Sequence, residues 1–395
     1  MSAITTSQKK IITASIPFLK EHGVDLTANF YKYMLETHPE VRPFFNKSHQ
    51  ITKKQPKILA FSLVKYAENI NDLTPLLGFV RQIVEKHVGL QVTPEQYDIV
   101  GSCLLKTLKE MVGEGATDEF MEAWKVAYYD LANILIDLEK KRYATELTTK
   151  DAWLGFKDAT VSKIVQESDS VKSVYIKPND EKLANFYPGQ YTTIRISTDS
   201  GATVQSREYS LSNEYPELQN GLQYYRISVR RIPGGVVSNY IHDQLKVGDA
   251  IKISSPYGKL LEPHFNAVKE SKDDSKPVVF FIGGIGITPS ISSIEYFLKQ
   301  GKKVQLYLSN SDVNSRPFGN WLERLIQEYP TLLSVDEFIS TTADLAGAFT
   351  NENVQNNDYY LIGPLGYMGL VTEFLQSKGL DVATINSEQY GPVAV

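Results

Sequence analysis

The chain has 395 residues, about two and a half times the usual length of one domain, so two or three hydrophobic cores are expected. Its net charge of -5 offers no positive field for nucleic acid, and its single cysteine excludes disulfides and cysteine-built zinc or iron–sulfur sites. We therefore expect no nucleic-acid partner and a reducing, cytoplasmic location.

No stretch of the sequence has the pattern of a signal peptide or a membrane span. The N-terminal stretch reads as an amphipathic helix that begins the fold. The longest apolar run, VVFFIGGIGI at 278–287, is too short for a bilayer and is broken by three glycines. We expect a chain without membrane spans.

Residues up to about 145 show helical periodicity almost throughout, which predicts an all-α domain. Breaks are predicted at Gly23 and at the stretches HPEVRPFF, NDLTP and GEGATD. The predicted helical segments lie near 8–22, 25–36, 56–69, 73–88, 94–112 and 117–142.

One histidine stands out on the helix predicted near 73–88. The apolar positions Leu76, Val80, Ile83 and Val84 recur at helical spacing, and the same face continues onto His87. Such a histidine is either a core residue satisfied by a neighbour or a ligand, and the pattern by itself favours the first.

From Trp153 to about Pro263 the hydrophobic period changes to two, and turn residues separate the segments. Short strands at this spacing predict an antiparallel β-barrel. The predicted strands are VKSVYIKP, QYTTIRIS, REYSLS, YYRISVRR and AIKISSPYG.

The charged stretch NAVKESKDDSKP at 266–277 has no periodic pattern and predicts a domain junction. After it, strands and helices alternate, which predicts an α/β domain with a parallel sheet covered on both faces. The predicted domains are therefore residues 1–148, 151–265 and 276–395.

The α/β domain opens with the glycine-rich turn GGIGITP, which joins an apolar strand to a helix predicted from about Thr288. Free backbone N–H groups and the helix dipole at such a turn bind a pyrophosphate, while Gly284 and Gly286 let the backbone approach it. A purely structural turn remains the alternative. The predicted dinucleotide site comprises Gly284, Ile285, Gly286, Ile287, Thr288 and Pro289.

The barrel contains a second candidate site, REYS at 207–210 followed by PGGVVSNY at 233–240. An arginine offers a fork for a diphosphate, a tyrosine offers a flat ring, and Gly234 and Gly235 permit close backbone approach. The alternative is a strand edge followed by a hairpin, and each motif alone leaves that alternative open.

The order PGQY, REYS, GGVVSN, GGIGITP, IGPLGYM and EQYGP resembles the ferredoxin-reductase family over about 240 residues. The resemblance implies an FAD-binding barrel before a domain that binds NADPH or NADH, with Tyr390 against the flavin and Glu388 near it. It also implies FAD contacts from Tyr191, Arg207, Glu208, Tyr209, Ser210, Gly234, Gly235, Val237 and Ser238.

Two segments depart from that family. Ile362-Gly363-Pro364 stands where members often carry Cys-Gly-Pro, and Leu308-Ser309-Asn310-Ser311 stands where many carry a His-Ala-Ala-like element. Both would lie near the dinucleotide, so the choice between NADH and NADPH stays open.

The helical half resembles the flavohaemoglobins in TANFYKYM, PFFNKS, QPKIL, EKHVGLQVTPEQY and ANILIDLE. The resemblance implies haem b held without covalent attachment, with His87 as the iron ligand. It further implies Phe45 against the porphyrin, Tyr31, Gln55 and Leu59 on the distal side, Lys86 towards a propionate, and Tyr97 and Glu139 beside the ligating imidazole.

Physical chemistry supports some of these roles and questions others. A carboxylate that accepts the Nδ1–H of a ligating histidine raises its electron donation to iron. Taken singly, however, Glu139 and Gln55 fit surface positions, and Tyr31 and Tyr97 fit core packing. Pro56 suits the first turn of a helix, so the distal helix is expected to start late.

The combined resemblance implies an NAD(P)H-dependent nitric oxide dioxygenase, a monomer acting on the small molecules NO and O2. Two alternatives remain at this stage. One is a flavin, ferric-iron or peroxide reductase with the globin as an accessory acceptor, and the other is an O2 or NO sensor whose reductase half has weakened.

Overall fold

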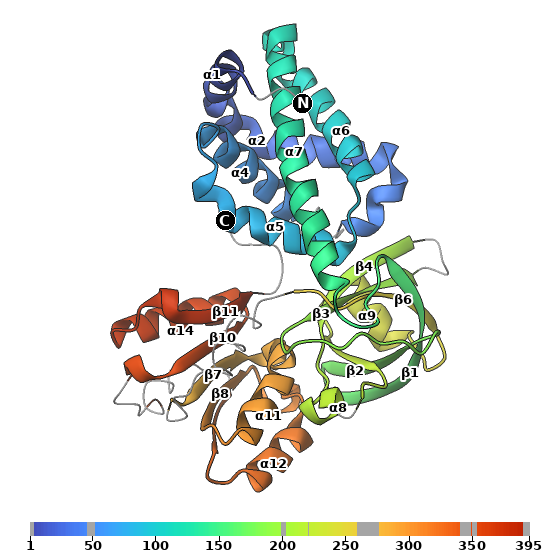
Figure 1. Ribbon diagram of the computed structural model, residues 1–395, viewed down its shortest axis with the longest axis vertical. Coiled ribbons are helices and arrows are strands. Elements are labelled where there is room, and N and C mark those ends of the chain that lie inside the picture. Colours follow the sequence, from blue (N-terminus) through green and yellow to red (C-terminus); the bar gives the residue numbers. More distant parts are fainter. Residues whose placement is uncertain are drawn as a thin grey trace. The chain divides into compact units, whose positions relative to one another are not determined.

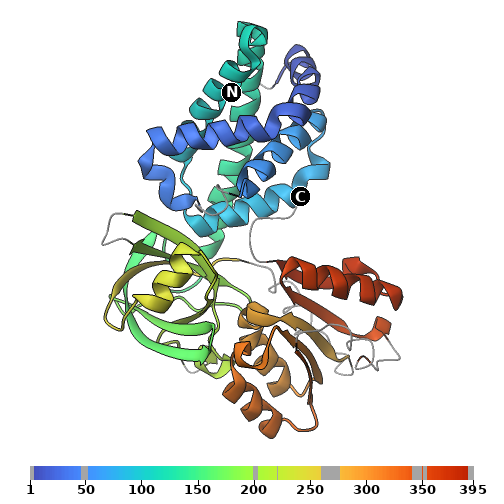
Figure 2. The ribbon, with the colours of Figure 1, turned by 180° about the vertical axis from the view of Figure 1, so that it is seen from behind.

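The computed structural model describes residues 4–45, 52–198, 203–219, 221–258, 276–339, 349 and 354–389. The chain forms two compact units. The first contains Met1–Thr149, Arg195–Arg207 and Pro392–Val395, and the second contains Lys150–Ile194 and Glu208–Gly391. Figures 1 and 2 show the helical region and the two sheets from opposite sides.

The helical region consists of six α-helices, within the described ranges, and three short 3-10 turns. The α-helices are α1 (Thr6–Ala14), α2 (Ile16–Thr37), α4 (Lys54–Glu68), α5 (Leu77–Leu90), α6 (Pro94–Val112) and α7 (Asp118–Glu146). The 3-10 turns are η1 (Pro39–Phe44), η2 (Thr74–Leu76) and η3 (Gly113–Gly115), and they fall at the three predicted multi-residue breaks. The predicted all-α region is therefore confirmed.

Local sequence explains where several helices begin. Thr5 and Gln8 form a capping box at α1, and Thr93 and Gln96 form another at α6, where Pro94 occupies the first turn. The Thr117 hydroxyl accepts a hydrogen bond from the Phe120 N–H at the start of α7. These caps satisfy backbone donors that a helix start would otherwise leave open.

The predicted break at Gly23 is wrong, because α2 runs through it without interruption. A Cβ at Gly23 would lie 3.4 Å from the Cβ of Ala60 in α4. This glycine therefore allows two helices to approach closely and does not end one. The boundary between α1 and α2 lies instead at Ser15. Its backbone N–H donates hydrogen bonds to the Ile11 and Ile12 carbonyls at the end of α1, and Pro17 lies in the first turn of α2.

The barrel sheet has six strands in the order β4-β3-β6-β1-β2-β5. An isolated antiparallel bridge between Leu211 and Ile227 joins the end of β4 to β5. The strands are β1 (Phe156–Ser168), β2 (Val171–Pro178), β3 (Tyr191–Thr198), β4 (Thr203–Ser210), β5 (Tyr225–Arg230) and β6 (Ala250–Ser254). Five predicted strands are confirmed with small shifts at their ends, and β1 lies outside the predicted set.

Two helices in the barrel region were absent from the sequence prediction. The short helix α8 covers Tyr215–Gln219, and α9 covers Val236–Asp243. The second begins directly after Gly235, so the glycine pair leads into a helix and not into a hairpin. Its β-branched residues have weak helix propensity, but burial of Val237 and Ile241 on one helical face stabilises the helix.

The last region forms a five-stranded parallel sheet in the order β11-β10-β7-β8-β9. Its strands are β7 (Val278–Gly283), β8 (Val304–Asn310), β9 (Leu333–Ile339), β10 (Asp358–Gly363) and β11 (Ile385–Gln389). Its helices are α11 (Ile291–Lys299), α12 (Gly319–Glu328) and α14 (Leu365–Ser377), with 3-10 turns η5 (Gly284–Ser290), η6 (Val313–Ser315), η7 (Val354–Asn356) and η8 (Val382–Thr384).

Alternate residues of the central strand β7 bury against opposite faces of this sheet. Phe280 and Ile282 pack with α11 and α12, whereas Val279 and Phe281 pack with α14. Both faces of the sheet are therefore covered (Figure 1), as the alternation of strands and helices predicted.

Within the described ranges, no helix is long and apolar enough to span a bilayer. The predicted junction at 266–277 lies almost entirely outside the described residues.

Candidate functional site

His87 lies in the last turn of α5, beside the buried stripe of that helix. Helix α5 buries Val80, Val84 and Val88, at steps of four residues, together with Gly89. His87 follows Ile83 on the neighbouring face, and its side chain is 31% exposed. The predicted continuation of the apolar stripe onto His87 is therefore displaced by one position, because the stripe continues onto Val88.

One nitrogen of the His87 ring is held by two residues from distant parts of the chain. Nδ1 lies 2.8 Å from the Tyr97 hydroxyl oxygen in α6 and 2.8 Å from Glu139 Oε1 in α7. The Tyr97 hydroxyl donates a hydrogen bond of 2.5 Å to the same Glu139 oxygen. Glu139 is 3% exposed, so the surface position that its sequence context suggested is wrong.

This arrangement selects one tautomer of the histidine. Burial and the neighbouring Glu139 carboxylate raise the pKa of the Tyr97 phenol, so the phenol remains a donor. A carboxylate accepts only, so the Glu139 contact requires a proton on Nδ1 of His87. The lone pair then resides on Nε2, and no residue in the described ranges bonds that nitrogen. A neutral imidazole with a free Nε2 lone pair fits an iron ligand.

Tyr31 lies in α2 within a separate, largely apolar cluster. Its side chain is 7% exposed, and its ring meets the Phe45 ring edge-on at a centroid distance of 5.5 Å. Leu59 of α4 packs against the same cluster. Burial raises the pKa of the Tyr31 phenol, and a hydrogen bond with the Gln55 side chain opposes that rise.

The expectation that the distal helix starts after Gln55 is wrong. Helix α4 begins at Lys54, so Gln55 and Pro56 both lie in its first turn. Pro56 is tolerated there because the N–H groups of a first turn lack helical partners in any case. Its carbonyl accepts a hydrogen bond of 2.8 Å from the Thr27 hydroxyl of α2, which ties the two helices together.

Helix α6 connects the Tyr31 cluster with the His87 group. Cys103 and Leu104 of α6 belong to the buried cluster around Tyr31, while Tyr97 of the same helix reaches His87. The Tyr97 carbonyl accepts a hydrogen bond of 2.6 Å from Tyr128 of α7. Lys86 is half-buried in α5 next to His87, and its role towards a propionate stays a prediction.

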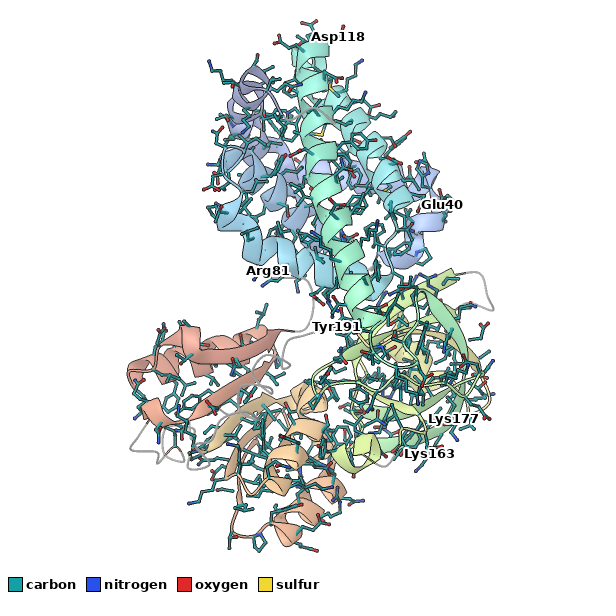
Figure 3. The ribbon with its side chains drawn as sticks, viewed as in Figure 1. Glu40, Arg81, Asp118, Lys163, Lys177 and Tyr191 are labelled. Carbon is teal, nitrogen blue, oxygen red and sulfur yellow. The ribbon has the colours of Figure 1, made fainter. Side chains whose placement is uncertain are left out.

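The candidate flavin residues gather around the ends of β3 and β4. Tyr191 begins β3 (Figure 3), and its ring packs over Gly258, where any Cβ would come within 2.9 Å of it. Arg207 in β4 donates to the Ser206 carbonyl at 2.6 Å and to Gln205 Oε1 at 3.1 Å. Ser210 is buried, and Glu208 and Tyr209 are half-buried between them.

The glycine pair after β5 prepares the start of α9. Gly234 has a positive φ of 71°, and a Cβ at Gly235 would lie 2.6 Å from the Ser238 hydroxyl. Among the residues that the structure describes, no side chain caps α9, so an anion could accept hydrogen bonds from its first N–H groups. Val237 and Ser238 are both buried in that first turn. The arrangement suits a diphosphate, as the motif predicted.

A cleft of about 460 Å³ lies where the carboxyl ends of the parallel strands face the barrel strands β2 and β5. Gly284 and Ile285 line this cleft, together with Ser309, Asn310 and Ser311 after β8. Ligands of open parallel sheets bind at this edge. The altered segment 308–311 thus contributes directly to the predicted nucleotide cleft.

The rest of the glycine-rich turn points inward. Gly286, Ile287, Thr288 and Pro289 are buried, and a Cβ at Gly286 would lie 2.6 Å from the Ile362 carbonyl of β10. The predicted helix start at Thr288 is wrong, because 284–290 form a 3-10 turn and α11 begins at Ile291. Gly286 therefore allows close packing between strand ends, and of the two glycines predicted to approach a phosphate only Gly284 lines the cleft.

Sequence reasoning missed Arg230, the last residue of β5. Its guanidinium lines the cleft and lies 3.4 Å from the place of a Cβ on Gly284. No residue in the described ranges pairs with this guanidinium. The neighbouring Arg231, by contrast, is paired with Asp243 at 2.5 Å. The pattern YYRISVRR gave no signal, since adjacent arginines on a strand end are common surface residues.

Two predicted residues cannot be placed. The backbone of Glu388 belongs to β11 and pairs with Ile362, but its side chain lies outside the described residues. Tyr390 also lies outside them.

Comparison with known proteins assigns the two halves to a class. The Globin family model matches residues 28–135, and the Oxidoreductase FAD-binding domain model matches residues 158–261. The chain is thus a globin fused to an FAD-type oxidoreductase module.

Several known proteins are similar to this chain over nearly the whole length of both. The chain is 42% identical to the flavohemoprotein of Schizosaccharomyces pombe, covering 98% of this chain and 92% of that protein. It is also 42% identical to the flavohemoprotein of Candida albicans, over 98% and 97% of the two chains. A crystal structure of a flavohemoglobin from Malassezia yamatoensis with bound FAD and haem is 25% identical, with a TM-score of 0.81 over 99% and 100% of the chains. The chain belongs to the flavohemoprotein family.

Proposed function

We propose that the chain is an NAD(P)H-dependent nitric oxide dioxygenase. In this reaction one NO, one O2 and one electron give one nitrate, so each two-electron NAD(P)H supports two turnovers. A solved FAD/NAD-binding domain from Vibrio cholerae, 27% identical with a TM-score of 0.51 over 60% of this chain, is named as part of a nitric oxide dioxygenase. That relative supports the assignment of the reaction.

The cofactors are haem b, FAD and NADPH or NADH. His87 would hold the haem iron through Nε2, and the first turn of α9 with Arg207 would hold the FAD diphosphate. The cleft beside Gly284 would accept the nicotinamide dinucleotide. When bound, these groups supply hydride acceptance, single-electron transfer and O2 binding.

The hydrogen-bonded group of His87, Tyr97 and Glu139 is the observation that carries this proposal. A globin that only stores O2 needs no buried carboxylate on its ligating histidine, whereas Glu139 gives the imidazole partial imidazolate character. The added electron donation favours chemistry on O2 over reversible binding. The Tyr31 phenol is predicted to lie on the distal side of the haem. Burial keeps this phenol protonated, and it is hydrogen-bonded to the Gln55 side chain, so it could donate a hydrogen bond to a partly negative oxygen.

The test is the stoichiometry of the purified protein loaded with haem and FAD. We expect NADPH or NADH with O2 to accelerate NO loss, with one nitrate formed per NO and one NAD(P)H oxidised per two NO. NAD(P)H oxidation without nitrate would support a reductase role instead. A haem that stays ferric for minutes after NAD(P)H is added would support a sensor.

A further inference from the structure

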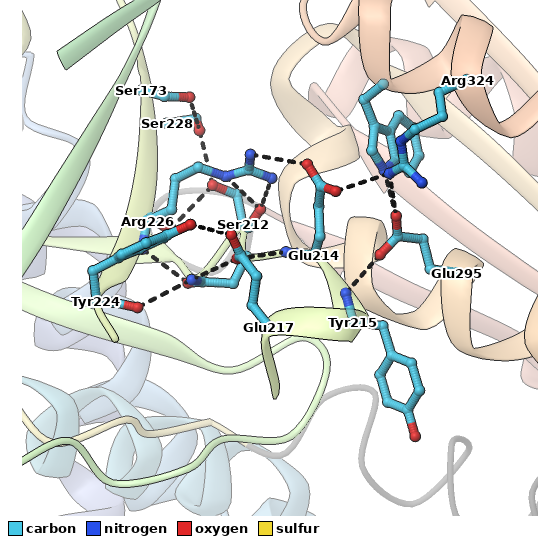
Figure 4. A network of polar contacts seen from close by, with 12 residues as sticks. Ser173, Ser212, Glu214, Tyr215, Glu217, Tyr224, Arg226, Ser228, Glu295 and Arg324 are labelled. Carbon is cyan, nitrogen blue, oxygen red and sulfur yellow. Dashed lines mark hydrogen bonds and ion pairs between the residues drawn. The ribbon is translucent and has the colours of Figure 1, made fainter. Parts of the chain in front are cut away.

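A partly buried network of charged residues links the segment that follows the flavin motif to the helix that follows the nucleotide turn. The segment Ser212–Tyr215 comes directly after REYS and Leu211, and α11 comes directly after the glycine-rich turn. Figure 4 shows the side chains of this network meeting between the two elements. The two cofactor motifs are therefore separated from the network by only a few residues each.

Glu295 of α11 is the centre of the network. It is 2% exposed, and both of its carboxylate oxygens accept hydrogen bonds. Oε2 accepts from the Tyr215 backbone N–H at 2.6 Å, while Oε1 accepts from Trp321 Nε1 at 3.1 Å and from Arg324 Nη2 at 2.7 Å. One carboxylate thus holds the barrel segment with one oxygen and helix α12 with the other.

Arg324 provides a second link to the same barrel segment. Its Nη2 also donates to Glu214 Oε2 at 2.8 Å, so a single nitrogen lies between Glu214 and Glu295. Burial raises the pKa of the Glu295 carboxyl, and the Arg324 hydrogen bond opposes that rise. A carboxylate this buried is tolerated because the guanidinium and the Tyr215 N–H both satisfy it.

The barrel side of the network is rigid in turn. Arg226 of β5 is 5% exposed and donates through Nε to the Ser212 carbonyl at 2.8 Å. Its backbone N–H donates to Asn213 Oδ1 at 2.8 Å, and its Nη1 lies 3.4 Å from Glu214 Oε1. The segment that Glu295 contacts is therefore fixed to the barrel wall, two to five residues beyond the end of the flavin motif REYS.

We propose that Glu295 is a positioning residue which, with Arg324 and Glu214, sets the nucleotide-binding turn in register with the flavin-binding segment. This inference rests on the proposed electron path from NAD(P)H to FAD but not on the fate of NO. Apolar packing between the two domains would resist separation yet tolerate sliding. A carboxylate with donors from both sides fixes orientation, because hydrogen bonds weaken steeply with angle.

The test uses the full chain loaded with FAD and haem, and it compares Glu295→Gln with Glu328→Gln. Glu328 forms an ion pair with the same Arg324 at 3.2 Å, within helix α12. Glu328→Gln therefore removes one carboxylate charge beside Arg324 and leaves every contact with the barrel segment in place. Two quantities are measured, namely the anaerobic rate of flavin reduction at saturating NADPH or NADH and the hydrogen–deuterium exchange of peptides covering 211–219.

For Glu295→Gln we expect flavin reduction to slow by roughly tenfold to hundredfold, as misplacement of reacting groups by a fraction of an ångström does. FAD content and nucleotide affinity should be unchanged, and exchange in 211–219 should rise by about tenfold as local opening becomes easier. Glu328→Gln should stay within about twofold of the native protein in both quantities. A lower melting temperature with unchanged flavin reduction and exchange would overturn the proposal.

If Glu295→Gln does not fold, Arg324→Gln gives a related test, because Arg324 is 37% exposed. That substitution removes the hydrogen bonds of Arg324 to Glu214 and Glu295 and leaves the bond between Glu295 and the Tyr215 N–H in place. Arg324→Lys should restore part of the rate, since it keeps the charge and one donor. Flavin reduction is measured without NO. If the native protein forms no nitrate, the dioxygenase assignment is refuted, but the comparison of flavin reduction rates still tests the role of Glu295.

Discussion

The hydrogen-bonded group of His87, Tyr97 and Glu139 differs from the nucleotide cleft in how many of its polar groups already have protein partners. Around His87, the ring nitrogen Nδ1 and the Tyr97 hydroxyl are both paired with Glu139 Oε1, and the ring nitrogen Nε2 has no partner within the described ranges. In the cleft, the Arg230 guanidinium lacks a partner within the described ranges, and the buried Asn310 Oδ1 lacks one as well. The first site thus has a histidine already oriented by its neighbours, whereas the second has polar groups without protein partners among the described residues.

The difference follows from what each ligand needs. A resident metal group needs one ligand of fixed tautomer and direction, so the partners of that ligand must be built into the fold. A nicotinamide dinucleotide binds and leaves in each cycle, so its site presents donors and backbone that stay unpaired until it arrives. Four substitutions would break or sharpen this contrast.

The largest effect is expected for His87→Ala. Loss of the predicted iron-ligating imidazole should abolish haem retention and reduce NO consumption by at least about a hundredfold. Loss of a residue that only hydrogen-bonds a metal ligand already costs about ten- to a hundredfold. Haem content is read from the Soret absorbance and NO loss from an electrode. Flavin reduction by NAD(P)H should continue at the native rate. Persistent nitrate formation would show that the site is elsewhere.

Arg230→Met should act on the cleft and leave the haem untouched. Removing a charge-assisted hydrogen bond costs about 1.5–3 kcal/mol, which corresponds to a rise of roughly tenfold to hundredfold in KM for NAD(P)H at nearly constant kcat. The matched control is Arg231→Met, because Arg231 is already paired with Asp243. Equal effects of the two substitutions on KM would remove Arg230 from the nucleotide site.

Glu139→Gln tests the completed site without removing the ligand. An amide is a weaker acceptor than a carboxylate, so the imidazole should donate less to iron. We expect turnover to fall by about tenfold and the iron–histidine stretching frequency to shift downward. Resonance Raman spectra of the ferrous protein measure that frequency. An unshifted frequency would mean that Glu139 serves packing alone.

Tyr97→Phe should give the smallest effect and the opposite spectroscopic sign. The phenol and the His87 Nδ1–H share Glu139 Oε1, so removing the phenol leaves this oxygen a stronger acceptor for the imidazole. The frequency should rise slightly, turnover should change by less than about threefold, and unfolding free energy should fall by about 1 kcal/mol. Unchanged turnover together with an unchanged frequency would contradict the role of Tyr97.

Much of the architecture could be predicted because the elements follow from local patterns. The continuous apolar run VVFFIG indicates a strand buried on both faces, and Thr93-Pro94 with Gln96 fixes the start of α6. Local patterns gave the wrong helix boundaries where a residue type is compatible with more than one structural role. Gly23 was predicted to break a helix that it instead brings close to α4, and Gln55 lies inside a helix that was expected to start after it.

The sequence by itself determined the three kinds of structure along this chain, the family resemblance and the position of His87 on a helix. Only the tertiary structure decided which groups meet: Glu139 reaches His87 across 52 residues, Arg230 reaches the glycine-rich turn, and Glu295 holds Tyr215 across 80. Periodicity and caps act over a few residues, so they fix elements. Contacts between distant side chains depend on how those elements pack, which no local pattern records.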